Sequence, residues 1–236
     1  MSNQKAGNVK IRRFPKAFVW AHTINGLAFF ALYITALPMY TNFFDWLYPV
    51  LGGPANARLL HRIFAVAFIA PTFILLIFSP KFFMLWMKEL ITWKKRDLAF
   101  FGNFVKELFG FKFGHVRQTF FNAGEKINSI LQIFCAILVI VSGFTMWLPQ
   151  YFPKALVQWG YFLHNVGFAL GIAVIVGHIY LSVIHKHSRP GWSGVVTGKV
   201  PAWWAKGHYA DWYDEEVKKG NFPDLDKLDK KKNKGA

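Results

Sequence analysis

The stretch YFLHNVGFALGIAVIVGHIYLSVI, residues 161–184, contains no Lys, Arg, Asp or Glu, but it holds two histidines, His164 and His178. A helix of about 20 apolar residues is long enough to cross the hydrocarbon core of a bilayer. The stretch therefore predicts a membrane-spanning helix. Its two imidazoles need an explanation, because ionisable side chains inside a membrane are costly and usually functional.

The composition of the whole chain supports a membrane protein. Of its 236 residues, 54% are hydrophobic and only 17% are charged, whereas about 25% of a typical soluble domain is charged. The formal net charge of +16 comes mostly from basic residues that lie outside the apolar runs, the exceptions being Arg58 and Arg62 beside His61. That placement indicates a positive cytoplasmic face rather than a surface that binds nucleic acid.

Four segments are long and apolar enough to span the bilayer, at residues 17–40, 57–78, 127–148 and 155–184. They predict an all-α fold, an integral membrane four-helix bundle. The expected domains are an N-terminal tail (1–16), a transmembrane domain (17–184) with a central loop (81–126), and a C-terminal tail (185–236). Within the loop, FFMLWMKELITW (82–93) predicts a helix lying in the membrane interface. The charged end, DLDKLDKKKNKGA (224–236), predicts disorder.

The distribution of basic residues predicts the orientation. The N-terminal tail, the central loop and the C-terminal tail are rich in Lys and Arg, whereas residues 41–56 have none and residues 149–154 have one. By the positive-inside rule, both termini face the cytoplasm.

The four histidines within the spans pair by depth. His164 and His178 are 14 positions apart, which is about 21 Å along a helix and within about 40° of the same face. His22 lies near the cytoplasmic start of the first span, at the depth of His178. His61 lies near the outer start of the second span, at the depth of His164.

This arrangement fits two b-type haems. Two neutral imidazoles from facing helices can hold a six-coordinate iron, and such ligation suits electron transfer because it leaves no open iron position. Nearby glycines would let a flat macrocycle approach, or would serve helix packing instead. They are Gly26, Gly167, Gly171 and Gly177. A single intramembrane histidine can equally be a structural hydrogen-bonding residue or part of a proton path.

Several stretches carry a family resemblance that runs from about Ile11 to Tyr213. They are RFPKAFVWAHT around His22, ARLLHRIF around His61, FNAGEKINSILQ from Phe121, YFLHNVGF around His164, GHIYLSV around His178, and GKVPAWWAKGHYADWY from Gly198. With these motifs the chain resembles the cytochrome b (gamma) subunit of membrane-bound formate dehydrogenases. FNAGEK and the last motif are more discriminating than the histidines.

The resemblance implies four helices and two haems b, one held by His61 and His164 near the outer side and one by His22 and His178 near the cytoplasm. It also implies a quinone pocket, for menaquinone or ubiquinone, formed by Asn122 and Gly124 beside His178. Family members often have Gln after that glycine, where this chain has Glu125.

The residues of FNAGEK also permit simpler roles. Asn122 could donate to and accept from a quinone carbonyl, or could cap the third span. Gly124 lets a ring approach the backbone. Glu125 could relay protons, but the favourable position of an acidic residue near a helix N-terminus is the preferred interpretation.

The resemblance implies a multi-pass subunit of the bacterial inner membrane that passes electrons from a periplasmic iron–sulfur partner to quinone. The expected partners are the iron–sulfur (beta) and catalytic (alpha) subunits of formate dehydrogenase, in a higher oligomer of the heterotrimer. No Cys-rich cluster motif is present, so no catalytic residue for formate oxidation is expected on this chain. The alternatives are the cytochrome b of a nickel–iron hydrogenase or a related quinone-linked reductase, a proton-coupled transporter, and a purely structural membrane anchor.

Overall fold

The computed structural model describes residues 9–109, 111 and 116–227. Four of its helices are long and apolar enough to cross a membrane. They are α2 (Lys16–Tyr40), α4 (Pro54–Phe78), α7 (Ala123–Trp147) and α8 (Lys154–Ile179), and α8 continues as a π-helical turn, η3 (Tyr180–Ile184). The prediction of an all-α membrane fold with four spanning helices is confirmed.

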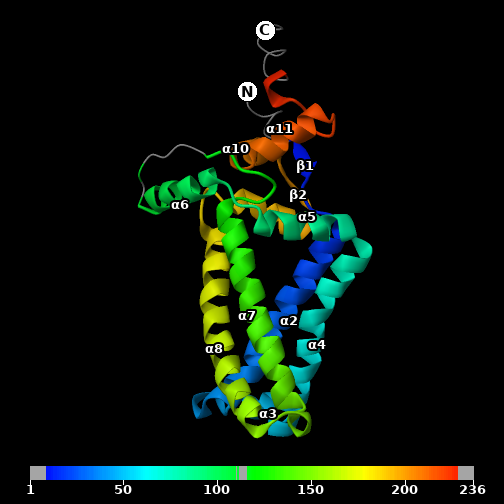
Figure 1. The fold of residues 1–236 in the computed structure, drawn as a ribbon, viewed down its shortest axis with the longest axis vertical. Coiled ribbons are helices and arrows are strands. Elements are labelled where there is room, and N and C mark those ends of the chain that lie inside the picture. The colour runs from blue at the N-terminus through cyan, green and yellow to red at the C-terminus, as the bar shows by residue number, and fades with distance from the viewer. Residues whose placement is uncertain (1–8, 110, 112–115, 228–236) are drawn as a thin grey trace. The chain divides into compact units, whose positions relative to one another are not determined.

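The chain divides into two compact units, each built around one helical hairpin. The N-terminal hairpin unit comprises residues 12–85 and 193–199. The C-terminal hairpin unit comprises residues 1–11, 86–192 and 200–236, of which the structure describes 9–11, 86–109, 111, 116–192 and 200–227. In Figure 1, α2 and α4 lie side by side as one hairpin, and α7 and α8 as the other.

In the N-terminal hairpin unit, a glycine and a proline mark the start of α4. Pro54 occupies the first turn of α4, where its missing N–H is not needed, and Gly53 before it adopts a φ of 95°. The connection from α2 to α4 contains a short helical turn, η1 (Asn42–Phe44), and the helix α3 (Leu47–Leu51). Tyr48 closes this connection by donating a hydrogen bond of 2.9 Å to the carbonyl of Pro38.

In the second hairpin, a short turn, η2 (Pro149–Tyr151), joins α7 to α8. The two helices approach closely at Gly167 of α8, because a Cβ there would lie 2.7 Å from Cγ1 of Val139 on α7. Gly160 and Gly171 of α8 are also buried. Of the two sequence-based interpretations of Gly167, the structure therefore supports helix packing.

The central loop contains two helices where the sequence predicted one. The predicted helix is α5 (Pro80–Ile91), and a second helix, α6 (Lys95–Leu108), follows it. Sequence reasoning missed α6 because Lys and Arg interrupt its apolar residues, although the aromatic residues between them give it an apolar face. The placement of α5 in the membrane interface stays a prediction.

The segment after the fourth span is folded. It comprises η4 (Arg189–Gly191), α9 (Trp192–Thr197), β2 (Lys199–Pro201), α10 (Ala202–His208) and α11 (Ala210–Lys218). The strand β1 (Lys10–Arg12) pairs with β2. Within the C-terminal hairpin unit, a small core forms around Val200, Trp204, Tyr209, Tyr213 and Leu225, each at most 5% exposed.

This core corrects part of the disorder predicted for residues 224–236. Leu225 is buried in it, and Asp226 pairs with Lys206 at 2.6 Å. Residues 224–227 are ordered because burial of the apolar Leu225 side chain offsets the entropic cost of ordering the chain around it. Residues 228–236 lie outside the described part of the chain.

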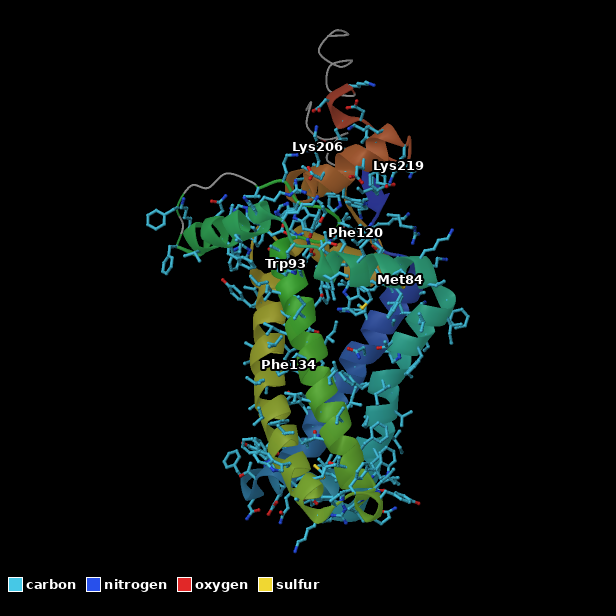
Figure 2. All side chains as sticks on the ribbon, in the orientation of Figure 1. Met84, Trp93, Phe120, Phe134, Lys206 and Lys219 are labelled. Carbon is cyan, nitrogen blue, oxygen red and sulfur yellow. The ribbon has the colours of Figure 1, made fainter. Side chains whose placement is uncertain are left out.

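The long helices present apolar side chains on their outer surfaces. Figure 2 labels one of these, Phe134, on α7, whose side chain is 52% exposed. Among the buried residues of the four helices are small or polar ones such as Ala28, Thr35 and Ser142. That pattern, with large apolar groups outside and small or polar groups inside, is typical of helices packed in lipid.

Replacing Gly167 with alanine tests the close packing of α7 on α8. The added Cβ would overlap Val139, so we expect the free energy of unfolding to fall by about 1–3 kcal/mol. Thermal unfolding of the detergent-purified protein measures it. Gly102→Ala in α6 is the control. Apart from the backbone of α6 and the two neighbouring residues, no described atom lies within 4 Å of the Cβ that this substitution adds. Equal stability of the two variants would contradict this account of the packing.

Candidate functional site

His61 on α4 is held by a hydroxyl from the other helix of its hairpin. The Oγ1 atom of Thr35 on α2 lies 2.9 Å from Nδ1 of His61. Thr35 is almost completely buried. The contact turns the imidazole so that Nδ1 faces the neighbouring helix, and the opposite nitrogen, Nε2, is the one directed away from this bond.

His164 on α8 has the same arrangement in the other hairpin. The Oγ atom of Ser142 on α7 lies 3.0 Å from Nδ1 of His164. The ring also lies against Gly143, where a Cβ would approach Cε1 of His164 to 3.4 Å. A serine and a glycine in succession on α7 thus provide both the hydrogen bond and the space for this imidazole.

His178 in the last turn of α8 is held by an amide. The Nδ2 atom of Asn128 on α7 lies 3.1 Å from Nδ1 of His178. An amide can present either its oxygen or its nitrogen after a half-turn, so this contact suits either tautomer of the ring. The π-helical turn η3 starts two residues later, and such turns occur often at functional sites.

His22 lies in the second turn of α2, with its ring 5.8 Å from that of Phe18. Sequence reasoning placed His22 and His178 at one depth and His61 and His164 at the other. His22 and His61 belong to the N-terminal hairpin unit, and His164 and His178 to the C-terminal one. Each predicted haem would therefore take one imidazole from each unit, and this pairing stays a prediction.

The residues around these histidines fit a b-type haem. Histidines that ligate a metal usually bond their second ring nitrogen to a protein group, and three of the four do so here through Nδ1. If a Cβ were added at Gly26 or Gly177, no described atom would lie within 4 Å of it, apart from the backbone of the same helix and the two neighbouring residues. Both glycines lie within four residues of a predicted ligand, so their backbones leave room for a flat group.

A second group of polar contacts surrounds the start of α7. Asn122 caps this helix, because its Oδ1 accepts a hydrogen bond of 2.9 Å from the N–H of Glu125. The Glu125 carboxylate in turn accepts from the N–H of Asn122 at 3.0 Å and from the Tyr209 hydroxyl at 2.7 Å. Gln118 accepts from the N–H of Ala123. The capping box explains why α7 begins at residue 123 rather than 127.

The capping role and a quinone-binding role are compatible at Asn122. Its Oδ1 is used by the cap, while its Nδ2 lies 3.5 Å from the Tyr209 hydroxyl and carries a second hydrogen. Gly124 lies against Phe100 of α6, where a Cβ would approach the ring to 3.2 Å. Glu125 lies in the first turn of α7, where the helix dipole favours a carboxylate. Binding of quinone by Asn122 and Gly124 stays a prediction.

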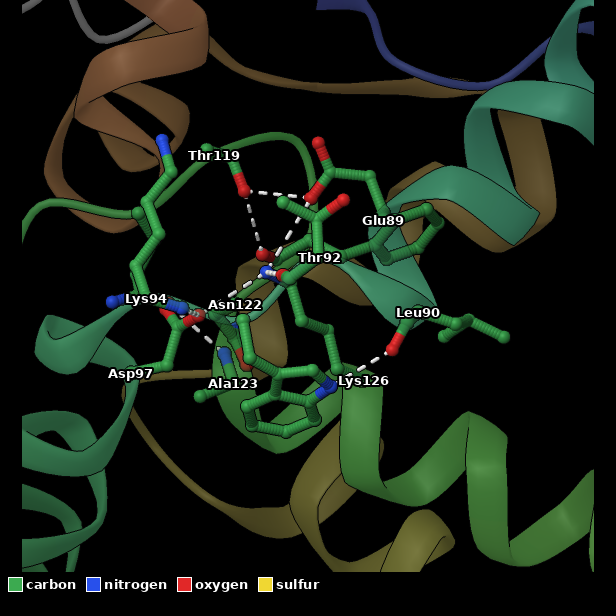
Figure 3. Close-up of polar contacts among 12 residues, drawn as sticks. Glu89, Leu90, Thr92, Lys94, Asp97, Thr119, Asn122, Ala123 and Lys126 are labelled. Atoms are coloured by element: carbon green, nitrogen blue, oxygen red, sulfur yellow. Dashed lines mark hydrogen bonds and ion pairs between the residues drawn. The ribbon is translucent and has the colours of Figure 1, made fainter.

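Sequence reasoning missed Lys126, which is buried beneath this cap. Its side chain is only 2% exposed. The ammonium donates to the carbonyl of Thr92 at 2.9 Å and lies 3.4 Å from Asp97 and 3.6 Å from Glu89 (Figure 3). Glu89 also accepts from Thr119 at 2.7 Å. We refer to Lys126, Asp97 and Glu89 as the lysine cluster, which connects α5, α6 and α7.

A lysine at the start of a span ordinarily extends to the interface, so burial of Lys126 could not be expected from its position in the sequence. Its two acidic partners lie 29 and 37 residues earlier in the chain, and only the fold brings them together. The cluster fixes the segment on which Asn122 and Gly124 are carried.

Three further histidines, His185, His187 and His208, lie in the described part of the chain and contact other groups. His185 bonds Ser188, His208 stacks on Trp204, and the carbonyl of His187 accepts from Trp204. His115 lies outside the described residues. Among the described residues, no group of three or more His, Cys, Asp or Glu side chains could by itself hold a metal ion.

Comparison with known proteins shows the family to which this chain belongs. The sequence profile described as "Prokaryotic cytochrome b561" matches residues 13–198. The cytochrome b556(Fdn) subunit of the nitrate-inducible formate dehydrogenase of Escherichia coli K12 is 28% identical over 210 residues, covering 88% of this chain and 90% of that protein.

Two further relatives are similar over most of their length. The cytochrome b556(fdo) subunit of formate dehydrogenase from Escherichia coli K12 is 29% identical, over 82% of this chain and 87% of the relative. The formate dehydrogenase cytochrome b556 subunit of Haemophilus influenzae is 26% identical, over 84% of this chain and 79% of the relative. The resemblance to this group, first drawn from the motifs, is confirmed.

The Asp97→Asn substitution tests the lysine cluster. It keeps an acceptor for the N–H of Lys94, which bonds Asp97 at 2.9 Å, but it removes the charge that faces buried Lys126. Breaking a buried ion pair typically costs about 3–5 kcal/mol, and we expect thermal unfolding to show a loss near the lower value because Glu89 remains. Adding Lys126→Met should recover much of the loss.

The control is Lys206→Ala, which breaks the more exposed pair with Asp226 and should cost less than about 1 kcal/mol. If Asp97→Asn were no more destabilising than this control, the lysine cluster would not be the support described above.

Proposed function

Because this chain belongs to the prokaryotic cytochrome b561 family, we propose that it is the dihaem b subunit of a membrane-bound formate dehydrogenase. In this role it passes electrons from a periplasmic iron–sulfur partner to quinone at the cytoplasmic side of the bacterial inner membrane. Formate oxidation would belong to the partner subunits. The proposal rests on the family, on the named relatives and on the histidine contacts.

One observation carries the haem-binding part of the proposal. Three histidines, one on α4 and two on α8, each direct Nδ1 toward a polar side chain on the helix packed against them in the same hairpin. Such bonds fix the orientation of metal-ligating imidazoles. A proton relay would instead favour chains of ionisable groups, and the hydroxyl and amide partners seen here do not titrate.

The proposed ligand pairs follow from depth and from the resemblance. His61 and His164 would hold the outer haem, and His22 and His178 the haem nearer the cytoplasm. When bound, each haem would supply a one-electron carrier held by two imidazoles of this chain. The protein contributes the imidazoles, three of them oriented by hydrogen bonds, and Gly26 and Gly177 would leave space beside His22 and His178.

The quinone would bind at the start of α7, beside His178. Asn122 would donate its remaining amide hydrogen to a quinone carbonyl, while its Oδ1 keeps the helix cap. Gly124 keeps the adjacent backbone free of a side chain. Tyr209 and Glu125 hold Asn122 from the other side, and the lysine cluster supports the segment as a whole.

This placement would make the reaction electrogenic. The distribution of Lys and Arg favours both termini in the cytoplasm, and the start of α7 would then lie on that side. Electrons arriving from outside would meet a quinone that takes its protons from the cytoplasm. Moving one charge against 100 mV stores about 2.3 kcal/mol.

The proposed partners are the iron–sulfur (beta) and catalytic (alpha) subunits, assembled into a higher oligomer of the heterotrimer. The named relatives are themselves cytochrome subunits of formate dehydrogenases. Menaquinone or ubiquinone would be the electron acceptor. Copurification of the subunits distinguishes this assembly from a hydrogenase or another reductase that uses a similar cytochrome.

A reduced-minus-oxidised spectrum with haem quantification tests the two-haem proposal. We expect two haems b per chain in the wild type and loss of at least one in His61→Ala and in His178→Ala, since each variant removes an axial ligand. His187→Ala, outside the spans, is the control and should keep both. A folded wild-type chain without an α band would contradict the proposal and favour a transporter or a structural anchor.

The Asn122→Ser substitution tests the quinone site. Serine keeps a side-chain oxygen for the helix cap but lacks the amide donor. We expect the KM for a soluble quinone analogue to rise about fivefold to tenfold, as expected for loss of one hydrogen bond of about 1 kcal/mol or slightly more. The haem content should not change. Wild-type quinone kinetics in this variant would remove Asn122 from the site.

A further inference from the structure

The Thr35 hydroxyl has only one hydrogen, and its oxygen lies within hydrogen-bonding distance of two carbonyls of its own helix and of one imidazole. Its Oγ1 donates within α2 to the carbonyls of Ala31 at 2.9 Å and Leu32 at 3.0 Å. When the hydroxyl keeps this bond to its own helix, the same oxygen accepts at Nδ1 of His61, which lies at 2.9 Å. The imidazole is then the donor, with its proton on Nδ1, and this tautomer is the first step of the inference.

Ser142 repeats this chemistry in the other hairpin. Its Oγ donates within α7 to the carbonyls of Leu138 at 2.5 Å and Val139 at 3.4 Å. At Nδ1 of His164, 3.0 Å away, it is then an acceptor. Two hairpins that share no helix thus present the same chain of bonds, from imidazole N–H to hydroxyl to helix carbonyl.

Burial keeps both chains of bonds intact. Thr35 is 1% exposed and Ser142 is 3% exposed, so water does not compete for either hydroxyl. With the proton on Nδ1, the lone pair of each ring lies on Nε2, the atom through which an imidazole in this orientation would ligate iron. The contact between Asn128 and His178 does not determine which nitrogen of His178 carries the proton, because an amide can donate or accept.

We propose that Thr35 and Ser142 are positioning residues that fix His61 and His164 as iron ligands and lower the reduction potential of the haem they hold. This inference rests on the proposed function and adds two residues to it. Neither residue contacts the cofactor in this account. Each acts through a histidine, on the same one of the two haems.

The direction of the effect follows from ligand basicity. An imidazole that donates its second N–H is a more basic ligand, and a more basic ligand stabilises ferric more than ferrous iron. Removing either hydroxyl should therefore make that haem easier to reduce. Because the two substitutions act on different ligands of that haem, their effects on its reduction potential should add approximately.

A purely structural role would give a different result. Serine and threonine often bond the preceding turn of their own helix and bridge helices in membranes. In that case Thr35→Val and Ser142→Ala would alter stability but leave the potentials of the haems unchanged. The reduction potential therefore separates the two roles.

The test is a spectroscopic redox titration of the purified heterotrimer, which resolves the two haems. In Thr35→Val, and separately in Ser142→Ala, the reduction constant of one haem should rise about tenfold, or about 59 mV for one electron. The same haem should shift in both variants, and the double variant should shift it further.

Matched variants complete the design. Thr35→Ser retains the hydroxyl and should keep the wild-type potential. Thr145→Val removes another buried hydroxyl of α7, one that bonds the carbonyl of Ser142 at 2.7 Å, and should leave both haems unchanged. Asn128→Leu should move only the other haem, since it acts at His178.

Unchanged potentials in both Thr35→Val and Ser142→Ala, with two haems still bound, would overturn the inference while leaving the dihaem proposal intact. Shifts of different haems in the two variants would overturn it as well. Wild-type protein that binds no haem would instead overturn the proposed function itself, and the haem-to-protein ratio measured on the same samples reveals which of the two has failed.

Discussion

The structure depends on a single constraint: a polar side chain within the hydrocarbon core must find its partner inside the protein. In this chain the constraint is met between helices of the same hairpin. Thr35 meets His61 across α2 and α4, while Ser142 and Asn128 meet His164 and His178 across α7 and α8. Each contact uses Nδ1 of the imidazole, so the other ring nitrogen is directed elsewhere. The histidine contacts that join the two helices within each hairpin are thus the same contacts that would orient ligands for a metal.

A different constraint applies at the start of α7, where the chain enters the apolar region. There the first N–H groups of the helix are satisfied by Asn122 and Gln118, and the cap is held by Glu125 and Tyr209. Beneath it, the ammonium of Lys126 is buried against two carboxylates. A buried charge is tolerated only with such partners. The result is a helix start held by several hydrogen bonds and ion pairs, on the same helix as Asn128, the partner of His178.

The sequence predicted the parts that follow from local pattern. The four spans, the short connections and the candidate histidines all come from runs of apolar residues and the positions of single polar ones. The features that it did not predict depend on contacts between distant residues. Nothing in the local sequence pairs Lys126 with Asp97, Tyr209 with Glu125, or Leu225 with the small core near Trp204. Asn122 was assigned two alternative roles, and the structure shows the cap, while quinone binding stays a proposal.

The central claim is that each of two haems is held by two imidazoles, one from each hairpin. Low-temperature electron paramagnetic resonance of the oxidised, purified heterotrimer tests it most directly, because the signal reports the axial ligands of each ferric iron. The account predicts two low-spin signals typical of bis-imidazole ligation, and His61→Ala and His164→Ala should each abolish the same one. A high-spin signal in the wild type, or loss of different signals in the two variants, would contradict it.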